Sequence, residues 1–345
     1  MTRRILTILT TATLFCGTAF AQSNVGTSLA QFLKIEPSAR SAGTGNAGAA
    51  SGVGIEAVYY NTGVLGLLDG PAVMITHGFW FEDIAFDYAA ASLPVGDGNM
   101  MFSVTALNSG DIDVRTVSQP LGTGERYTVG DVAVGVGYGR RLSDRFAAGF
   151  RANYINERIW HTTATMLTFD TGGIYRLNDG GAAFGFCLSN IGTRGQFTGR
   201  DLAIQYDEDP DVHGDNSSLP AYHQTDMYPV PILFRIGMSY PVVLGEWSRM
   251  TFLADALHPN DNSESVNLGA ECSYRDVLFL RAGYQTLFRT DSYQDLTFGF
   301  GVAGEASGRS YRLDYAWSSH DYLQATHRIS LVLGFGHANS GGITP

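Results

Sequence analysis

From residue 72 onward, large apolar residues alternate with glycine or other small residues, and this pattern constrains the fold more than any other feature. Successive side chains of a β-strand point to opposite faces, so each such strand has one large apolar face and one small or polar face. A soluble sandwich would instead place polar residues on its solvent face. The pattern therefore predicts an all-β fold, a transmembrane antiparallel β-barrel. The clearest run alternates Val132, Val134, Val136 and Tyr138 with Ala133, Gly135, Gly137 and Gly139.

The alternation predicts about 14 strands, an even number that is typical of single-chain bacterial barrels. Short connections at 141–144, 177–180, 274–276 and 307–308 predict periplasmic turns, and longer ones at 108–127 and 191–228 predict outer loops. The predicted strands are 72–79, 83–93, 99–107, 128–140, 145–157, 161–175, 182–190, 229–241, 248–257, 264–274, 277–287, 294–304, 309–318 and 325–336.

Composition agrees with many short strands and tight turns. The chain has 42 glycines, where average usage would give roughly 24. After the first 21 residues no stretch approaches the roughly 20 apolar residues of a transmembrane helix. The net charge of −11 disfavours a nucleic-acid partner, because phosphate binding requires a positive surface, and none is predicted.

The N-terminus has the features of a secretory signal peptide at 1–21. Arg3 and Arg4 precede an apolar stretch, and Ala19-Phe20-Ala21 fits the small-x-small cleavage rule. Cleavage there predicts export to the outer membrane of a Gram-negative-type bacterium. A lipidated Cys16 is the alternative, but a bulky residue precedes it. The remaining divisions are a plug or hatch segment at 22–68, the barrel at 69–336 and a C-terminal tail at 337–345.

The segment 22–68 lacks strand alternation and is rich in small residues, so it is predicted to pack inside the barrel. A flexible leader is the alternative. Its Gly43-Thr44-Gly45-Asn46-Ala47-Gly48 matches a dinucleotide-binding pattern, but the strand and helix that such a site requires are missing. The residues predicted to pack the plug are Arg40, Gly43, Gly45, Gly48 and Asn61.

Isolated arginines occur in the small-residue register of three predicted strands. Arg151, Arg235 and Arg281 each lie between apolar or small neighbours. A polar barrel interior accommodates such charges, so the three side chains are predicted to face the lumen.

An acidic cluster occupies the long loop 191–228. Asp207, Asp209, Asp211 and Asp215 present the oxygen ligands that Ca²⁺ prefers, or a surface for a basic partner. Their spacing does not follow a calcium-binding loop, so a solvated loop is favoured. No metal site and no cofactor are predicted.

Catalytic patterns are missing as well. Ser319-His320-Asp321 are neighbours in sequence, whereas a catalytic triad is assembled by geometry. The sequence has no metalloprotease or nucleophile-elbow motif, which predicts that the protein is not an enzyme.

Several short motifs together resemble the PorV/PorQ family of outer-membrane proteins, over roughly residues 27–336. At the typical Asn-Pro-Ala-Gly of that family this chain has Asn61-Thr62-Gly63-Val64, so only Asn61 carries over. The motifs are Gln31-Phe32-Leu33-Lys34-Ile35, Ala39-Arg40, Gly45-Asn46-Ala47-Gly48, Gly199-Arg200-Asp201-Leu202, His258-Pro259-Asn260-Asp261-Asn262 and Asn267-Leu268-Gly269.

The resemblance implies a 14-stranded barrel with an N-terminal plug and a role in type IX secretion. Secreted cargo proteins and secretion-system components would then be partners, bound at the outer loops, with outer-membrane lipid around the barrel. The alternative is a FadL-like transporter of small hydrophobic molecules. Both functions need a plugged barrel. The long acidic outer loop suits binding of a protein partner, whereas a transporter of hydrophobic molecules would need an apolar groove there.

Overall fold

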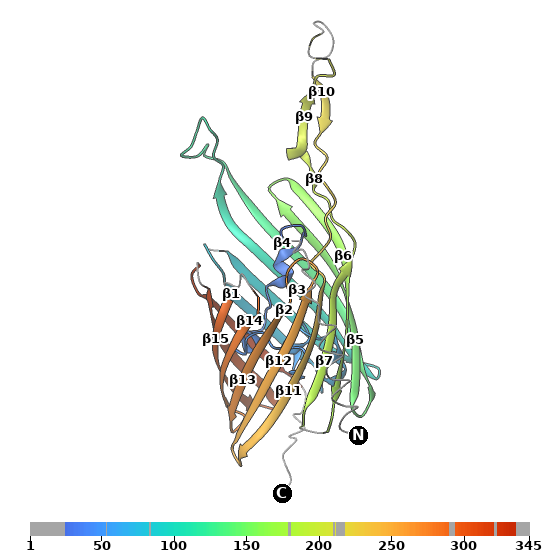
Figure 1. Cartoon of the computed structure of the whole chain (residues 1–345), viewed down its shortest axis with the longest axis vertical. Helices are drawn as coiled ribbons and strands as arrows, with labels where there is room; N and C mark the ends of the chain where they lie inside the picture. Colours follow the sequence, from blue (N-terminus) through green and yellow to red (C-terminus); the bar gives the residue numbers. More distant parts are fainter. Residues whose placement is uncertain are drawn as a thin grey trace, which may run out of the picture.

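The computed structural model describes residues 25–52, 54–82, 84–178, 181–209, 211, 218–289, 294–320 and 323–335. Fourteen antiparallel strands form a closed ring, because β5 pairs with β6 as well as with β4 (Figure 1). A fifteenth strand of the sheet, the two-residue β8 (Thr198–Gly199), pairs with the rim end of β6. The ring strands are β1 Ala72–Phe79, β2 Ala85–Val95, β3 Gly98–Asp113, β4 Arg126–Ser143, β5 Phe146–Ile159, β6 Thr162–Arg176, β7 Ala183–Gly192, β11 Leu233–Gly245, β12 Ser248–Pro259, β13 Ser265–Tyr274, β14 Leu278–Leu287, β15 Gln294–Ala306, β16 Arg309–His320 and β17 Thr326–Gly334.

The predicted fold class is confirmed, and each predicted strand corresponds to one strand of the ring. The largest difference lies at β3 and β4, which pair well beyond 99–107 and 128–140. A bulge between Asn108 and Asp111 lets this hairpin continue with polar residues, where apolar alternation has ended. Strand β11 begins at Leu233 and not at 229, because Pro229 and Pro231 have no N–H to donate to a ladder.

The long loop after β7 contains structure that the alternation did not reveal. It carries η4 (Arg200–Leu202) and a separate hairpin of β9 (Ala203–Tyr206) and β10 (Leu219–Tyr222). This hairpin stands clear of the barrel at the end where the long loops gather (Figure 1). The opposite end has the short turns, so the hairpin end is the outer end of an outer-membrane barrel.

The outer wall of the ring is apolar. Phe150, Ile236, Leu280 and Phe298 are each at least half exposed, while their neighbours along the strands face inward. Exposed apolar side chains on every strand make a surface suited to lipid, as in outer-membrane barrels. Among the described residues, no helix is both long and apolar enough to cross a membrane.

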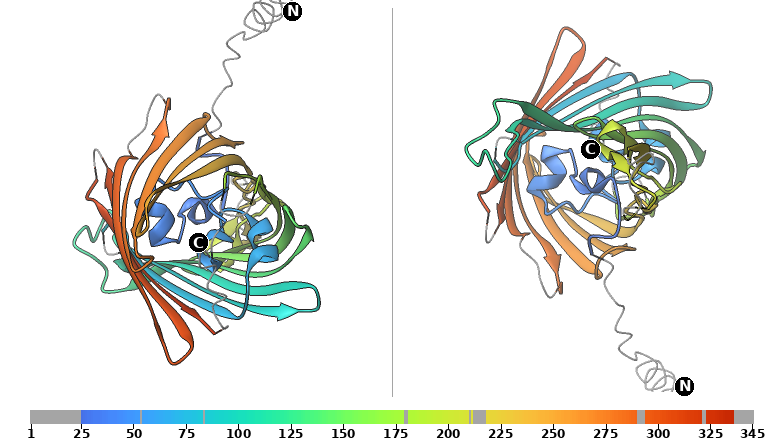
Figure 2. Two further views of the ribbon diagram at one scale, coloured as in Figure 1. Left: turned by 90° about the horizontal axis from the view of Figure 1, so that it is seen from below. Right: turned by 90° about the horizontal axis from the view of Figure 1, so that it is seen from above.

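The N-terminal segment, residues 25–68, lies within the ring (Figure 2). It is largely buried and forms four short helices, η1 (Gln31–Lys34), α2 (Ala39–Gly43), η2 (Ile55–Ala57) and η3 (Thr62–Leu67). The Ser38 side chain accepts a hydrogen bond from the Ser41 N–H at the start of α2, and the Asn61 side chain accepts one from the Gly63 N–H at the start of η3. These caps satisfy backbone donors that a buried helix end would otherwise leave unpaired.

Glycines on the inner wall face the backbone of the N-terminal segment. A Cβ atom at Gly185 would lie 1.9 Å from the carbonyl oxygen of Ala49, and one at Gly283 would lie 2.1 Å from the amide nitrogen of Gly45. Gly149 meets the carbonyl of Thr62 in the same way. The small residues of the alternation are therefore required because the wall touches another backbone, and no side chain fits between them.

Candidate functional site

A cavity of about 580 Å³ lies inside the ring between the N-terminal segment and the outer loops. Its floor includes residues 31–36 of the segment. Its sides come from the wall, and its mouth is bordered by loop residues such as Trp80, Asn262 and Leu323. It is thus a cup that opens toward the outer end of the barrel.

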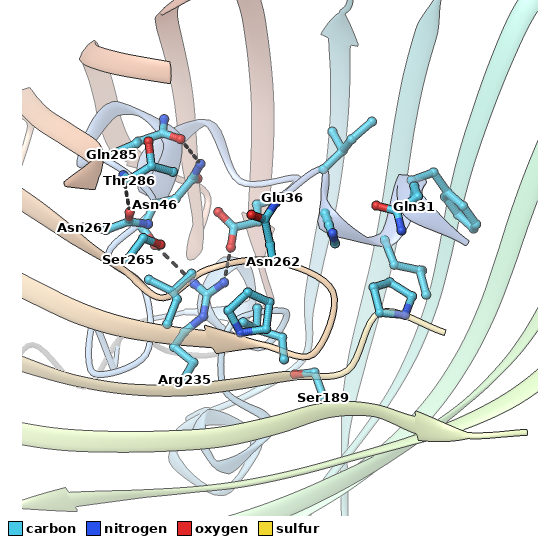
Figure 3. Close-up of a pocket in the computed structure, with 18 of the residues that line it drawn as sticks. Gln31, Glu36, Asn46, Ser189, Arg235, Asn262, Ser265, Asn267, Gln285 and Thr286 are labelled. Carbon is cyan, nitrogen blue, oxygen red and sulfur yellow. Dashed lines mark hydrogen bonds and ion pairs between the residues drawn. The ribbon is translucent and has the colours of Figure 1, made fainter. Parts of the chain in front are cut away.

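Arg235 of β11 organises the floor of the cavity (Figure 3). Its guanidinium forms an ion pair with Glu36 and donates to the carbonyl oxygen of Asn46 at 3.1 Å. It also lies over the ring of Tyr60, with 5.0 Å between Cζ and the ring centroid. The Asn46 side chain in turn donates to Gln285 of β14 at 3.2 Å. The floor is therefore a hydrogen-bonded junction of segment and wall.

The two tyrosines that line the cavity, Tyr59 and Tyr60, are neutral hydrogen-bond donors. Burial raises the pKa of both Tyr59 and Tyr60 well above the ordinary range. The Tyr59 hydroxyl donates to the carbonyl oxygen of Leu33 at 2.6 Å, and that of Tyr60 donates to Asn46 at 3.1 Å. Arg151, paired with Asp170 at 2.7 Å, lies over the Tyr59 ring.

Aromatic rings border the mouth of the cavity. Phe81 and Trp80, from the β1–β2 connection, contact each other with ring centroids 5.0 Å apart. His320 packs edge-on against Phe81 at 4.8 Å. Arg328 of β17 lies under the Trp80 ring, with 5.4 Å between Cζ and the centroid. A ligand that enters the cup would pass these rings before it reaches the polar floor.

Deeper in the ring, a six-charge network joins the segment to the wall. It alternates three guanidinium groups with three carboxylates, and its contacts include 2.6 Å from Arg40 to Glu271 and 2.8 Å from Arg281 to Asp314. Alternation leaves the network neutral, which makes its burial tolerable. Its members are Arg40 and Glu56 of the segment and Glu271, Arg281, Arg312 and Asp314 of the wall.

A second contact fastens the start of the segment to an outer loop. Asp261, between β12 and β13, accepts hydrogen bonds from Ser28, Gln31 and Lys34 at 2.6, 2.9 and 2.6 Å. Burial acts to raise the pKa of Asp261, but these hydrogen bonds outweigh it and lower the pKa below its ordinary value. Asp261 and its three donors are called the latch below.

The structure places the predicted plug residues as follows. Gly43 and Gly45 touch the wall at β15 and β14, whereas Gly48 packs against Tyr60 within the segment. Arg40 belongs to the six-charge network. Asn61 donates to the carbonyl oxygens of Ala49 and Gly173 at 2.7 and 3.0 Å, and so bridges segment and wall.

The three predicted inner arginines are buried, and each has a carboxylate partner. Arg151 pairs with Asp170, Arg281 with Glu271 and Asp314, and Arg235 with Glu36. Sequence reasoning missed Arg328, although it occupies the inner register two residues before Ser330. It also missed the acidic partners. Asp170 and Glu271 lie opposite Arg151 and Arg281 on neighbouring strands, and Glu36 comes from the segment, so finding them requires the strand register and the path of the segment.

The acidic loop does not approach the cavity. Asp209 and Asp211 are exposed and Asp207 is partly exposed, and Asp207 and Asp209 accept hydrogen bonds from backbone N–H groups two residues ahead. Asp215 lies outside the described residues, as do the signal peptide at 1–21 and the tail at 337–345. The structure's described residues contain no group of three His, Cys, Asp or Glu side chains placed to hold a metal ion.

Ser319 and His320, which are neighbours in sequence, each contact a different residue of the barrel. The Ser319 hydroxyl accepts a hydrogen bond from the Leu296 N–H at 3.3 Å, and His320 contacts the ring of Phe81. Asp321 lies outside the described residues.

No protein-family model matches the chain, and no curated protein matches it. Among solved structures it is similar to the CymD monoaromatic hydrocarbon channel, with a TM-score of 0.54 and 11% identity over 88% of this chain and 98% of that one. It is also similar to the Pseudomonas putida toluene transporter TodX, with a TM-score of 0.52 and 11% identity over 85% and 96%. At this identity the likeness shows a shared fold.

These comparisons correct the assignment to the PorV/PorQ family. The two solved structures named above are described as a hydrocarbon channel and a toluene transporter, and neither the family models nor the curated proteins support a secretion role. The predicted cargo and secretion-system partners are equally unsupported. The motifs behind the resemblance have a structural explanation, because Gln31 and Lys34 bind Asp261 in the latch and Gly45 touches the wall.

Proposed function

We propose that the chain is an outer-membrane channel that admits small hydrophobic molecules through the cup at its outer end. The observation that carries this proposal is the cavity itself, about 580 Å³ inside a closed barrel and open toward the outer loops. Ligand sites are usually preformed concave pockets with apolar walls and a few placed polar groups. Leu233, Leu257 and Trp80 supply apolar lining here, and Arg235 and Asn46 supply the polar groups.

CymD and TodX, which share the fold, are described as channels for monoaromatic hydrocarbons and toluene. A shared fold is an analogy on its own, so the proposal rests on the cavity first. We further propose that residues 1–21 are an export signal, and that the N-terminal segment closes the lumen below the cup. Passage then requires a change in that segment or in its contacts with the wall.

Filling the cup tests the proposed function. Leu257 lines the cavity, whereas the next residue along β12, Ala256, is exposed on the outer face. Uptake of radiolabelled toluene would be measured in intact cells that depend on this barrel for entry through the lipopolysaccharide leaflet. We expect Leu257→Trp to lower the initial rate at least about fivefold, because the indole occupies the cup.

Ala256→Trp is the matched control, because it adds a larger change of volume on the lipid side. It should leave uptake within about twofold of the wild-type rate, since lipid accommodates the added ring. Equal rates for the wild type, Leu257→Trp and cells without the barrel would show that the cup is not the route.

A further inference from the structure

One fully buried arginine in the cup has no ion pair of its own among the described residues, because the nearby Glu36 is paired with Arg235. Arg328 is 4% exposed, and its Nε and Nη1 groups have no hydrogen-bond partner among the described residues. The other three fully buried wall arginines, Arg151, Arg235 and Arg281, each have a carboxylate partner. Burying a charge without a partner costs free energy. A bound ligand that supplies the missing acceptor would account for an arginine at this position.

The guanidinium faces the place where a ligand would lie. Arg328 shares the inner face of β17 with Thr326 and Ser330, and it lines the cavity. Glu36 is the only acidic side chain among the described lining residues, and it is engaged by Arg235. The cup therefore presents the free N–H donors of Arg328 to whatever enters it. Arg289, which is only partly buried, also lines the cavity and has no ion pair among the described residues.

We infer that the cup binds a small aromatic monocarboxylate, with its carboxylate on Arg328 and its ring among the aromatic side chains at the mouth. This inference rests on the proposed function and names the class of molecule that the channel takes. A neutral hydrocarbon offers no acceptor to the unpartnered N–H groups, whereas a carboxylate matches the planar guanidinium with two parallel hydrogen bonds.

The residues around Arg328 favour an aromatic ring as the rest of the ligand. Trp80 lies over the guanidinium, Phe81 contacts Trp80, and Tyr60 lies in the same cavity. Aromatic rings pack well against one another in offset or edge-on contacts. One buried guanidinium holds one carboxylate group through its paired N–H donors, so the inference is confined to a monocarboxylate.

The test compares benzoate with methyl benzoate, which keeps the ring and loses the charge. Binding of each would be measured by titration calorimetry with the purified full-length barrel in detergent. We expect wild-type protein to bind benzoate at least about tenfold more tightly, in keeping with a charge-assisted pair of hydrogen bonds. Arg328→Gln should remove this preference and leave methyl benzoate binding within about twofold, while Arg328→Lys should keep part of it.

Two controls separate a ligand site from a structural role. Arg249→Gln removes a half-exposed arginine at the far end of the barrel, paired with Asp276, and should leave both affinities unchanged. Arg328→Gln should also raise the melting temperature, or leave it unchanged, because it removes an unpaired buried charge. A lower melting temperature would mean that Arg328 already has a partner in the free protein, and would overturn the inference.

The remaining outcomes are also decisive. Equal wild-type affinities for the two ligands, or an unchanged ratio in Arg328→Gln, would overturn the inference while the channel function stands. Hexanoate bound as tightly as benzoate would overturn the aromatic part. If the wild type bound neither benzoate, methyl benzoate nor toluene, the proposed function would fail with it.

Discussion

Gly45 shows at the scale of one residue how closely the N-terminal segment meets the wall. Its φ is +65°, and a Cβ atom there would lie 2.5 Å from the carbonyl oxygen of Leu268 and 2.9 Å from the amide nitrogen of Tyr284. Backbone atoms of a closed sheet cannot move aside as the end of a flexible side chain can. Both the conformation and the space at this position therefore require glycine.

We predict that Gly45→Ala destabilises the barrel by about 1–3 kcal/mol, because it combines backbone strain with a collision. The measurement is the temperature at which the folded band on a detergent gel converts to the unfolded band. Gly245→Ala is the control, since a Cβ atom there has no neighbour within 4 Å. Equal conversion temperatures for the two variants would contradict the close contact described at Gly45.

For the inner arginines, the sequence predicts the direction of the side chain but not its ion-pair partner. The alternation places Arg151, Arg235 and Arg281 on the inner face, since side-chain direction has a period of two. Whether each charge is paired depends on residues contributed by other strands or by the segment, such as Glu36 and Asp170. The register between strands and the path of the segment belong to the folded structure, so the absence of an ion pair at Arg328 among the described residues is visible only there.

At the scale of elements, the six-charge network ties the segment to β13, β14 and β16. Glu271 receives both Arg40 and Arg281, at 2.6 Å each. Glu271→Gln should destabilise the barrel by about 3–5 kcal/mol, because two buried guanidinium groups lose one shared carboxylate. Urea unfolding of the two proteins, followed by tryptophan fluorescence, measures the difference. Glu305→Gln, at an exposed position of β15, should stay within about 0.5 kcal/mol of wild type.

The latch makes the local stability of the start of the segment dependent on pH. The folded pKa of Asp261 is lowered, so its stabilising contribution is complete above the unfolded pKa and is lost as the pH falls through the folded value. We predict that amide hydrogen exchange of residues 28–34 accelerates on acidification, after correction for intrinsic rates. Asp261→Asn should exchange rapidly at every pH. Glu264→Gln, in the same loop but paired with His258, should behave as wild type.

Elements differ in how well the sequence predicted them. Strands such as β1 coincide with their predicted bounds because period-two alternation follows the lipid and lumen faces. The β9–β10 hairpin escaped prediction, since it stands outside the membrane and neither face needs to be apolar. The path of the segment inside the ring was equally hidden, because small residues show that a backbone can approach but not where it does so.

At the scale of the whole molecule, the segment occupies the lumen of a ring that is otherwise continuous (Figure 2). Deletion of residues 27–66 should convert the protein into an open pore with stable single-channel conductance in planar bilayers, because the ring itself stays closed by strand pairing. Deletion of 203–222, which removes the outer hairpin, is the control and should leave conductance as in the full chain. Unchanged conductance after the first deletion would mean that the segment does not close the lumen.

The glycine contacts of the wall have a consequence for the order of assembly. They lie on both sides of the ring, at Gly149 and Gly185 on β5 and β7 and at Gly269, Gly283 and Gly299 on β13, β14 and β15. A ring that closed empty would have to admit a folded chain segment with no clearance between backbones. In the full chain we therefore expect the segment to lie between the strands before the ring closes, so that β1 pairs with β17 around it.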